Sequence, residues 1–226
     1  MQKRSEQLLL AVKMQQPTID LVQQLGEWPL QQLKEQLSMD DAKIAFWVNI
    51  YNAFFLILRR EKGLVRPHIF RKKAIQIAGL DLSLDDIEHG ILRKYRWKWS
   101  LGYLPNPFVR QIIRQLAVDK LDPRIHFALN CGAESCPPIA FYKKEKLDQQ
   151  LDLASQSFLE SETDLYPEEK EVHTSRLLLW YRADFGGPRG ALNLLSQYLG
   201  RNLTGWKLRY KPYDWSEALG VFDGDQ

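Results

Sequence analysis

The sequence is poor in cysteine, lacks a long hydrophobic run and has little excess charge. Its early and central apolar stretches, Leu8–Val12 and Phe54–Leu58, are too short for a secretory signal or a membrane span, which need roughly 7–15 and about 20 apolar residues. We therefore expect a soluble, cytoplasmic protein with no membrane partner. The 31 basic and 28 acidic residues are interleaved and leave a net charge of +3, so the composition gives no reason to expect a nucleic-acid partner.

The two cysteines, Cys131 and Cys136, are the only ones in the chain. If Met1 is the native start, the lack of a signal places the protein in the reducing cytosol, where a structural disulfide is the less favoured use of such a pair. Catalysis, metal binding and simple burial as small apolar side chains remain as alternatives.

The chain has no internal repeat, no Gly/Ser-rich linker and no compositional break. Its 226 residues lie within the range of one domain, roughly 50–250 residues. Many helical patterns and a few scattered strand patterns, without regular βαβ alternation, favour an α+β fold. We predict one mainly helical domain with a small sheet, in which residues 1–38 form a helical lead-in and residues 39–226 form the core.

Hydrophobic periodicity predicts a central buried helix over Asp40–Glu61, capped by Ser38 or Asp40 and ended by Gly63. A second helix should begin with Ser83 as its cap and run to about Arg93. The remaining predicted elements are helices at Asn106–Val118, Glu145–Glu160, Ser175–Tyr181 and Ala191–Leu199, and strands at Ala74–Ala78, Arg124–Asn130 and around Val172.

The predicted strand at Arg124–Asn130 leads into the cysteine-containing loop. We expect any catalytic site to be centred on residues His126 to Cys136. In a strand, His126 and Asn130 would lie on one face while Phe127 and Leu129 would lie on the other, toward the core. The chain should then turn into a short, flexible loop that allows a ligand to approach the backbone closely.

Cys136 has the better prospects as a nucleophile of the two cysteines. A thiol attacks a carbonyl carbon only as the thiolate, which needs an imidazole or a helix N-terminus nearby. Pro137 can occupy the first position of a helical turn and so place Cys136 beside unpaired backbone N–H groups. His126 is the first candidate base and His89 is the second, and Cys131 is the alternative nucleophile.

Four polar side chains could orient such a base. Asn49 and Asn52 lie three residues apart on one face of the predicted central helix, where their alternative role is to hydrogen-bond a loop from within the core. Glu88 precedes His89 in a predicted helix, and such a pair is also common on exposed helical faces. Asp184 follows a predicted helix, where it can cap a neighbouring helix or orient an imidazole.

Four stretches of the chain carry a resemblance to a known family. They are FWVNIYNA at 46–53, DIEHGILR at 86–93, DPRIHFALNCGAESCPP at 122–138 and WYRADFG at 180–186. The sequence resembles the domain of unknown function 547 (DUF547) family. This resemblance implies a shared fold and site without an established reaction, and by analogy a distant relationship to papain- or transglutaminase-like cysteine hydrolases. The order found here, with the candidate histidine before the cysteine, would be unusual for that group.

Three classes of function follow from these residues. The first is a cysteine hydrolase or acyltransferase, peptidase- or amidase-like, that acts on a peptide, amide or protein substrate without a cofactor. The second is a metal site with His126, Cys131 and Cys136 as ligands, for which a fourth ligand is not evident. The third is a protein-interaction module in which the cluster braces a loop. A redox pair is a further option, although Cys-x₄-Cys differs from the Cys-x-x-Cys spacing of thioredoxin-like exchange.

Overall fold

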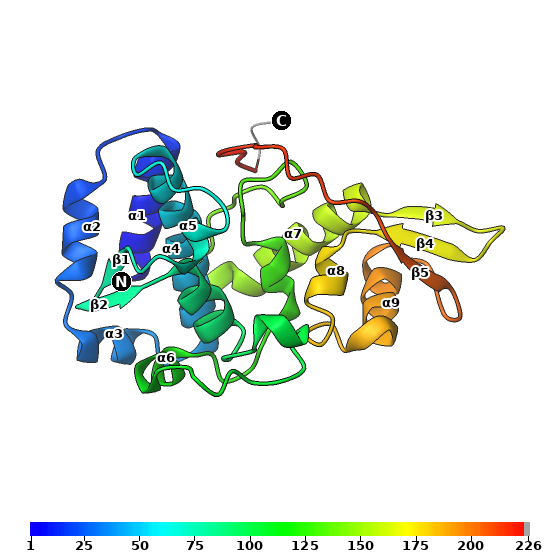
Figure 1. The fold of residues 1–226 in the computed structure, drawn as a ribbon, viewed down its shortest axis with the longest axis horizontal. Coiled ribbons are helices and arrows are strands. Elements are labelled where there is room, and N and C mark those ends of the chain that lie inside the picture. The colour runs from blue at the N-terminus through cyan, green and yellow to red at the C-terminus, as the bar shows by residue number, and fades with distance from the viewer. Residues whose placement is uncertain (224–226) are drawn as a thin grey trace.

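The computed structural model describes residues 1–223, whose elements form two groups side by side along the long axis (Figure 1). One group holds α1 (Gln2–Lys13), α2 (Ile19–Gly26), α3 (Leu30–Gln36), α4 (Asp40–Arg60), α5 (His68–Arg71), β1 (Ile75–Ile77), β2 (Leu80–Leu82) and α6 (Gln111–Leu116). The other holds β3 (Asp164–Tyr166), β4 (Glu171–Thr174), α8 (Leu177–Trp180), α9 (Gly187–Tyr198) and β5 (Lys207–Tyr210), and α7 (Leu147–Glu162) extends between the two. The structure is mainly helical with small sheets, which confirms the predicted α+β class. Residues 1–38, predicted as a helical lead-in, contain α1, α2 and α3.

α4 is the central helix of the first group. Aspartates occupy its first turn and arginines its last, as the helix dipole favours. Its N-cap is Met39, without a side-chain cap hydrogen bond, so the prediction of a Ser38 or Asp40 cap was wrong. The Asp40 carboxylate instead accepts hydrogen bonds from the backbone N–H groups of Asp119 and Lys120, both at 2.8 Å, and so fixes the loop after α6.

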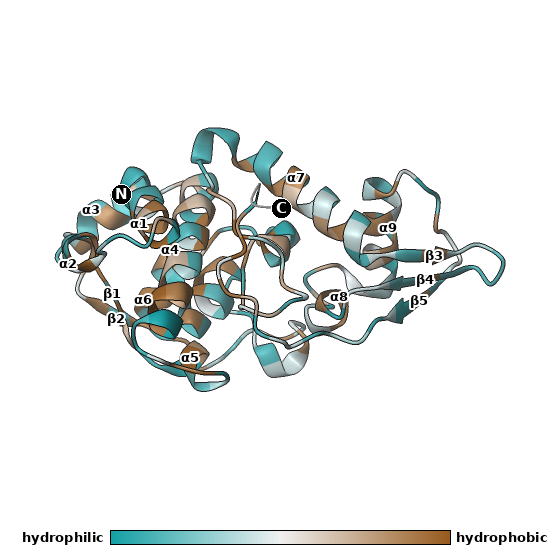
Figure 2. Cartoon of the chain, turned by 90° about the horizontal axis from the view of Figure 1, so that it is seen from above, coloured by the Kyte–Doolittle hydropathy of each residue, from teal (hydrophilic) through white to brown (hydrophobic). Residues whose placement is uncertain are grey.

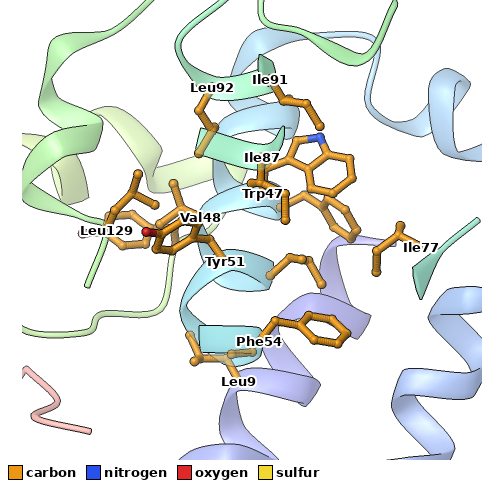
Figure 3. Close-up of a cluster of buried hydrophobic side chains, with 14 of the residues drawn as sticks. Leu9, Trp47, Val48, Tyr51, Phe54, Ile77, Ile87, Ile91, Leu92 and Leu129 are labelled. Carbon is orange, nitrogen blue, oxygen red and sulfur yellow. The ribbon is translucent and has the colours of Figure 1, made fainter. Parts of the chain in front are cut away.

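Every residue of α4 from Ala42 to Leu58 is buried. In Figure 3, Trp47 and Phe54 project from this helix into an apolar cluster that Ile87 and Ile91 join from a neighbouring turn. Within residues 1–223, α4 is the one helix long and apolar enough to cross a membrane, and 94% of its apolar window is buried inside the protein. A core helix meets the same criterion, and the packing around α4 accounts for its composition.

The strands form two small sheets. β1 and β2 make an antiparallel hairpin, while β4 pairs antiparallel with β3 and parallel with β5. The hairpin turn at Ala78 and Gly79, both with positive φ, donates backbone hydrogen bonds to the end of α2. The sequence predicted β1 and β4 but not β2, β3 or β5, which are only three or four residues long. Hydrophilic residues, coloured teal, dominate the projecting β3–β5 sheet (Figure 2).

The helices predicted near α7, α8 and α9 are confirmed with small shifts of their ends. The helix predicted at Asn106–Val118 is shorter and begins at Gln111. Its expected first turn is replaced by a turn in which the Asn106 side chain accepts a hydrogen bond from the Phe108 N–H at 2.9 Å. This local side-chain bond, together with Pro107, competes with the helical backbone pattern.

The segment that follows Ser83 forms η1 (Asp86–Leu92), a π-helical turn. Ser83 and Asp86 cap it reciprocally, since the Ser83 N–H donates to the Asp86 carboxylate and the Asp86 N–H to the Ser83 Oγ, at 3.0 and 3.1 Å. The predicted cap is therefore confirmed, but the helix is wider than an α-helix. Gly90 lets η1 pack closely against α6, because a Cβ there would lie 2.6 Å from Ile113 Cγ2.

The segment predicted as a strand at Arg124–Asn130 is instead η3 (Pro123–Phe127), a 3₁₀-helix. The Asp122 carboxylate accepts a hydrogen bond from the Arg124 N–H at 2.9 Å, and Pro123 occupies the first helical turn. This start signal overrides the β propensity of the residues that follow. The predicted alternation of faces was therefore wrong: His126, Phe127 and Asn130 are all buried.

The two hydrophobic cores meet at η3. Ile125 belongs to the larger core around α4, and Phe127 belongs to the smaller core beneath α8 and α9. Phe127 stacks against Phe158 of α7 at a centroid distance of 5.3 Å. η3 and the loop after it therefore lie at the junction of the two groups.

Candidate functional site

A cavity of about 220 Å³ opens at this junction. Residues from η1, η3, α8, the loop after η3 and the C-terminal segment line it; they include Glu88, His89, His126, Cys131, Cys136 and Tyr213. Five of the seven predicted site residues therefore line one cavity. Asn49 and Asn52 are not among the residues that line it.

Cys131 and Cys136 form a disulfide, with their Cα atoms 6.1 Å apart. This corrects the expectation from sequence that a structural disulfide is the less favoured use of the pair. The loop geometry explains why the bond forms. The Asn130 side chain accepts a hydrogen bond from the Gly132 N–H and donates one to the Pro137 carbonyl, both at 2.8 Å, and so draws the two ends of the loop together.

The Cys136 sulfur lies close to two hydrogen-bonding groups. The Cys131 N–H donates to it at 3.0 Å, and the Tyr213 hydroxyl lies 3.2 Å from it and 3.4 Å from the Cys131 sulfur. Burial raises the pKa of Tyr213, so its hydroxyl keeps its proton at neutral pH. The expected helical turn at Pro137 is absent, and the N–H of Cys136 is already bound to the Ala133 carbonyl at 2.9 Å. The backbone donor to the sulfur is therefore the N–H of Cys131 and not that of Cys136.

His126 is held by a buried carboxylate. Its Nε2 lies 2.9 Å from Oδ2 of Asp184, and its ring stacks on Tyr181 at 3.7 Å between centroids. Burial lowers the pKa of His126 and outweighs the opposing effect of Asp184, so the imidazole is neutral near pH 7. An ionised carboxylate only accepts hydrogen bonds, so Nε2 carries the proton and Nδ1 carries the lone pair.

Asp184 also forms a buried ion pair with Arg93. The two side chains are 0% and 1% exposed, and Arg93 Nε and Nη2 lie 2.5 and 3.1 Å from the carboxylate oxygens. Burial alone would raise the pKa of Asp184, but the hydrogen bonds from His126 and Arg93 lower it. The carboxylate is thus ionised and holds both a guanidinium and an imidazole.

His89 is oriented by the same guanidinium. Its Nδ1 lies 2.8 Å from Arg93 Nη1, and because arginine can only donate, Nδ1 is an acceptor and Nε2 carries the proton. Nε2 points toward Oδ1 of Asp85 at 3.6 Å. Burial lowers the pKa of His89, against the opposing effect of Glu88. In this arrangement His89 can donate a hydrogen bond at Nε2 but has no free lone pair with which to act as a base.

Glu88 is a buried carboxylate held by two phenols. Tyr181 donates to it at 2.6 Å and Tyr51 at 3.2 Å. Burial opposes ionisation, but neighbouring His89, the Tyr181 hydrogen bond and Arg93 together lower the pKa of Glu88. Burial and the adjacent carboxylate raise the pKa of both tyrosines. The cavity wall therefore carries an ionised carboxylate beside neutral phenols and imidazoles.

Asn49 and Asn52 brace the loops around the site from within α4. Asn49 bonds to both the N–H and the carbonyl of Tyr142, at 3.0 and 2.8 Å. Asn52 accepts from the Asn130 N–H and donates to the Ala128 carbonyl, both at 2.9 Å. Neither of these contacts involves a histidine, and they match the alternative role predicted for them.

Sequence reasoning placed less weight on the residues that complete the site. Asp184 was considered mainly as a helix cap, and Tyr51, Tyr181 and Tyr213 were not assigned roles. The signal for Asp184 was present in its position between α8 and α9, just before Phe185-Gly186-Gly187. No local pattern marks the tyrosines, because their partners lie far away in the sequence: Glu88 for Tyr51 and Tyr181, and the two cysteines for Tyr213.

The metal-site alternative finds little support in the geometry. Among residues 1–223, no group of three or more His, Cys, Asp or Glu side chains is arranged to hold a metal ion. The two sulfurs are bonded to each other, and the Nε2 of His126 faces Asp184.

Comparisons with known proteins agree with the motifs. Neither the curated proteins nor the solved structures gave a match. A model of one protein family matches residues 34–159, more than half of the chain, and this region contains α4, η1, η3 and both cysteines but not Asp184 or Tyr213. The chain therefore belongs to the family described as "Protein of unknown function, DUF547".

Proposed function

We propose that this protein is a thiol-dependent acyl-transfer enzyme, peptidase- or amidase-like, in which Cys136 is the nucleophile and His126 is the base. One observation carries the proposal: a single cavity is lined by both cysteines and by an imidazole that a buried carboxylate orients. The order carboxylate, imidazole, thiol is the arrangement by which such enzymes activate a cysteine. Asp184 takes the orienting role that the sequence had offered to Asn49, Asn52 or Glu88.

The disulfide must be opened before this chemistry begins. A dithiol reductant would supply two electrons and two protons, leaving Cys131 and Cys136 as thiols and the reductant as a disulfide. A reducing cytoplasm, the location we propose, would keep the pair in this form. The oxidised protein would then be the inactive form of the enzyme.

The surroundings of the Cys136 sulfur favour the thiolate. The Cys131 N–H, at 3.0 Å, and the Tyr213 hydroxyl, at 3.2 Å, can both donate hydrogen bonds to a negative sulfur. The neutral His126 would take the thiol proton on Nδ1, and Asp184 would stabilise the imidazolium. Asp184 acts through His126 and is therefore a positioning residue.

The reaction then follows in two balanced steps. The Cys136 sulfur would attack the carbonyl carbon of a peptide or other amide, and the proton on His126 would leave with the amine. Water, or an acceptor amine or hydroxyl, would next attack the thioester and restore the thiol. No cofactor is needed for either step.

The aromatic wall of the cavity indicates an apolar group beside the scissile bond. Trp180, Tyr213 and Trp215 contact one another at centroid distances of 4.6–5.5 Å, and Trp215 is half exposed. A wall of this kind can pack against an apolar side chain of a peptide or protein substrate.

The test uses Cys131→Ala, which cannot form the disulfide. This variant should react at Cys136 with an electrophilic amide-mimic probe without any reductant, whereas the unaltered chain should need a dithiol first. Cys136→Ala, the matched control, should not react in either condition, and circular dichroism should show that both variants fold. Labelling of the control at Cys131 at the same rate would contradict the proposal.

The disulfide itself favours a second candidate, thiol–disulfide exchange at the same cavity. The two functions differ in their need for the imidazole. Reduction of a model disulfide by the dithiol form should survive His126→Gln if the protein is an exchange catalyst. If the protein is an acyl-transfer enzyme, the same variant should lose its reaction with the amide-mimic probe, because that reaction needs the imidazole.

A further inference from the structure

The loop from Trp97 to Val109, here called the docking loop, exposes an unusual group of apolar side chains. Trp99 is 71% exposed, Tyr103 54%, Leu104 56% and Phe108 85%, and Leu101 is also exposed. Scattered exposed apolar residues are ordinary, but five within ten positions of one loop are an unusual concentration that indicates a partner. In Figure 1 the docking loop runs along the lower edge of the molecule, between α6 and α8.

Hydrogen bonds hold this loop in a defined shape. The Trp97 N–H donates to the Leu104 carbonyl at 2.9 Å, and the Asn106 N–H donates to the Tyr95 carbonyl at 2.7 Å. The tip is tied to the segment that follows α8, because the Ala183 N–H donates to the Leu101 carbonyl at 3.0 Å. The fold thus presents the apolar side chains outward on a braced loop.

The charged residues of the docking loop and of the segments that flank it are all basic. Between residues 89 and 118 the chain has six Lys and Arg and no Asp or Glu. Arg93, Lys98 and Arg110 form ion pairs with carboxylates from elsewhere, which leaves Lys94, Arg96 and Arg114. The latter three donate to backbone carbonyls of Asp119, Gly102 and Asn106, and no carboxylate within residues 1–223 forms an ion pair with them.

We propose that the docking loop binds the surface of an anionic lipid bilayer. Trp and Tyr favour the headgroup region, Leu and Phe can enter the acyl boundary, and unbalanced cations beside them attract anionic lipids. We expected no membrane partner because the apolar runs of the sequence are short. Run length, however, predicts only segments that span a membrane. Surface binding depends on exposure, which the sequence does not reveal. The proposal is independent of the chemistry at Cys136.

The full chain can be tested by co-sedimentation with vesicles of phosphatidylcholine alone and of phosphatidylcholine with about 30% phosphatidylserine. We expect binding to the mixed vesicles. The double variant Trp99→Ser with Phe108→Ser should bind at least about tenfold more weakly, because serine cannot replace the apolar area that each aromatic side chain buries in the bilayer. The matched control is Ile19→Ser with Met39→Ser, two residues that are each 71% exposed elsewhere. This control should bind as the unaltered chain does.

Each contrary outcome overturns the proposal. No sedimentation with mixed vesicles would assign the patch to another occupant, such as a protein. Equal binding to both vesicle types would exclude recognition of anionic lipid. Binding that the docking-loop variant and the control retain equally would show that these side chains do not enter the bilayer.

Discussion

The buried ion pair between Arg93 and Asp184 should dominate the energetics of the site. Both side chains are almost fully inaccessible, and two hydrogen bonds join them, at 2.5 and 3.1 Å. Asp184→Ala would leave a buried guanidinium without its counter-charge and would remove the partner of His126. Loss of one partner of such a pair costs about 3–5 kcal/mol, so we expect the free energy of unfolding to fall by that amount.

The measurement is urea unfolding followed by circular dichroism, with the free energy extrapolated to zero urea. The control is Glu217→Ala, which breaks the partly exposed pair with Arg59 and should cost no more than about 1 kcal/mol. A double variant, Arg93→Leu with Asp184→Leu, should cost less than the sum of the two single changes. A loss of less than about 1 kcal/mol for Asp184→Ala, equal to that of the control, would refute this account of the site.

Three further predictions concern stability. Because burial lowers the pKa of both His89 and His126, the unfolded chain binds more protons as pH falls below about 6.5. The free energy of unfolding should therefore decline below that pH, by up to about 1.4 kcal/mol per pH unit for each imidazole, and His89→Gln should flatten the decline measured by urea unfolding. Asn52→Ala should cost about 2 kcal/mol or more in the same assay, because the Asn130 N–H and the Ala128 carbonyl lose their buried partner. Reduction of the Cys131–Cys136 disulfide should lower the free energy of unfolding by about 2 kcal/mol, the value for so short a loop, when unfolding is compared with and without dithiol. An unchanged free energy would contradict the view that the disulfide constrains the unfolded chain.

The elements predicted best from the sequence are those with strong local signals. The apolar pattern of α4, the reciprocal cap at Ser83 and the clustering of His126 with two cysteines all depend on neighbouring residues, and the structure contains each of them. η3 was missed because Arg124–Asn130 was interpreted as a strand, although Asp122 and Pro123 just before it start a helix. The error also reversed the expected burial of Asn130.

The partners within the site could not be predicted, because long-range packing selects them. Asp184 lies 58 residues from His126 and 91 from Arg93, and Tyr181 lies 93 residues from Glu88. The disulfide was disfavoured on the ground of compartment, whereas its formation depends on the distance between the two cysteines after the loop closes. Exposure of the docking loop is likewise a property of the fold, because its apolar residues alone would suit a core.

The most direct test of the central claim is the alkylation rate of each cysteine in the reduced protein, resolved by mass spectrometry, at about pH 6.5 and about pH 8.5. An ordinary thiol should react about fiftyfold more slowly at the lower pH, because its thiolate fraction falls by that factor. We predict that the alkylation rate of Cys136 falls much less than fiftyfold, whereas Cys131 behaves as an ordinary thiol. In Asp184→Asn, the alkylation rate of Cys136 should depend on pH more nearly as that of an ordinary thiol does. A fiftyfold loss at both cysteines would contradict the assignment of Cys136 as an activated nucleophile.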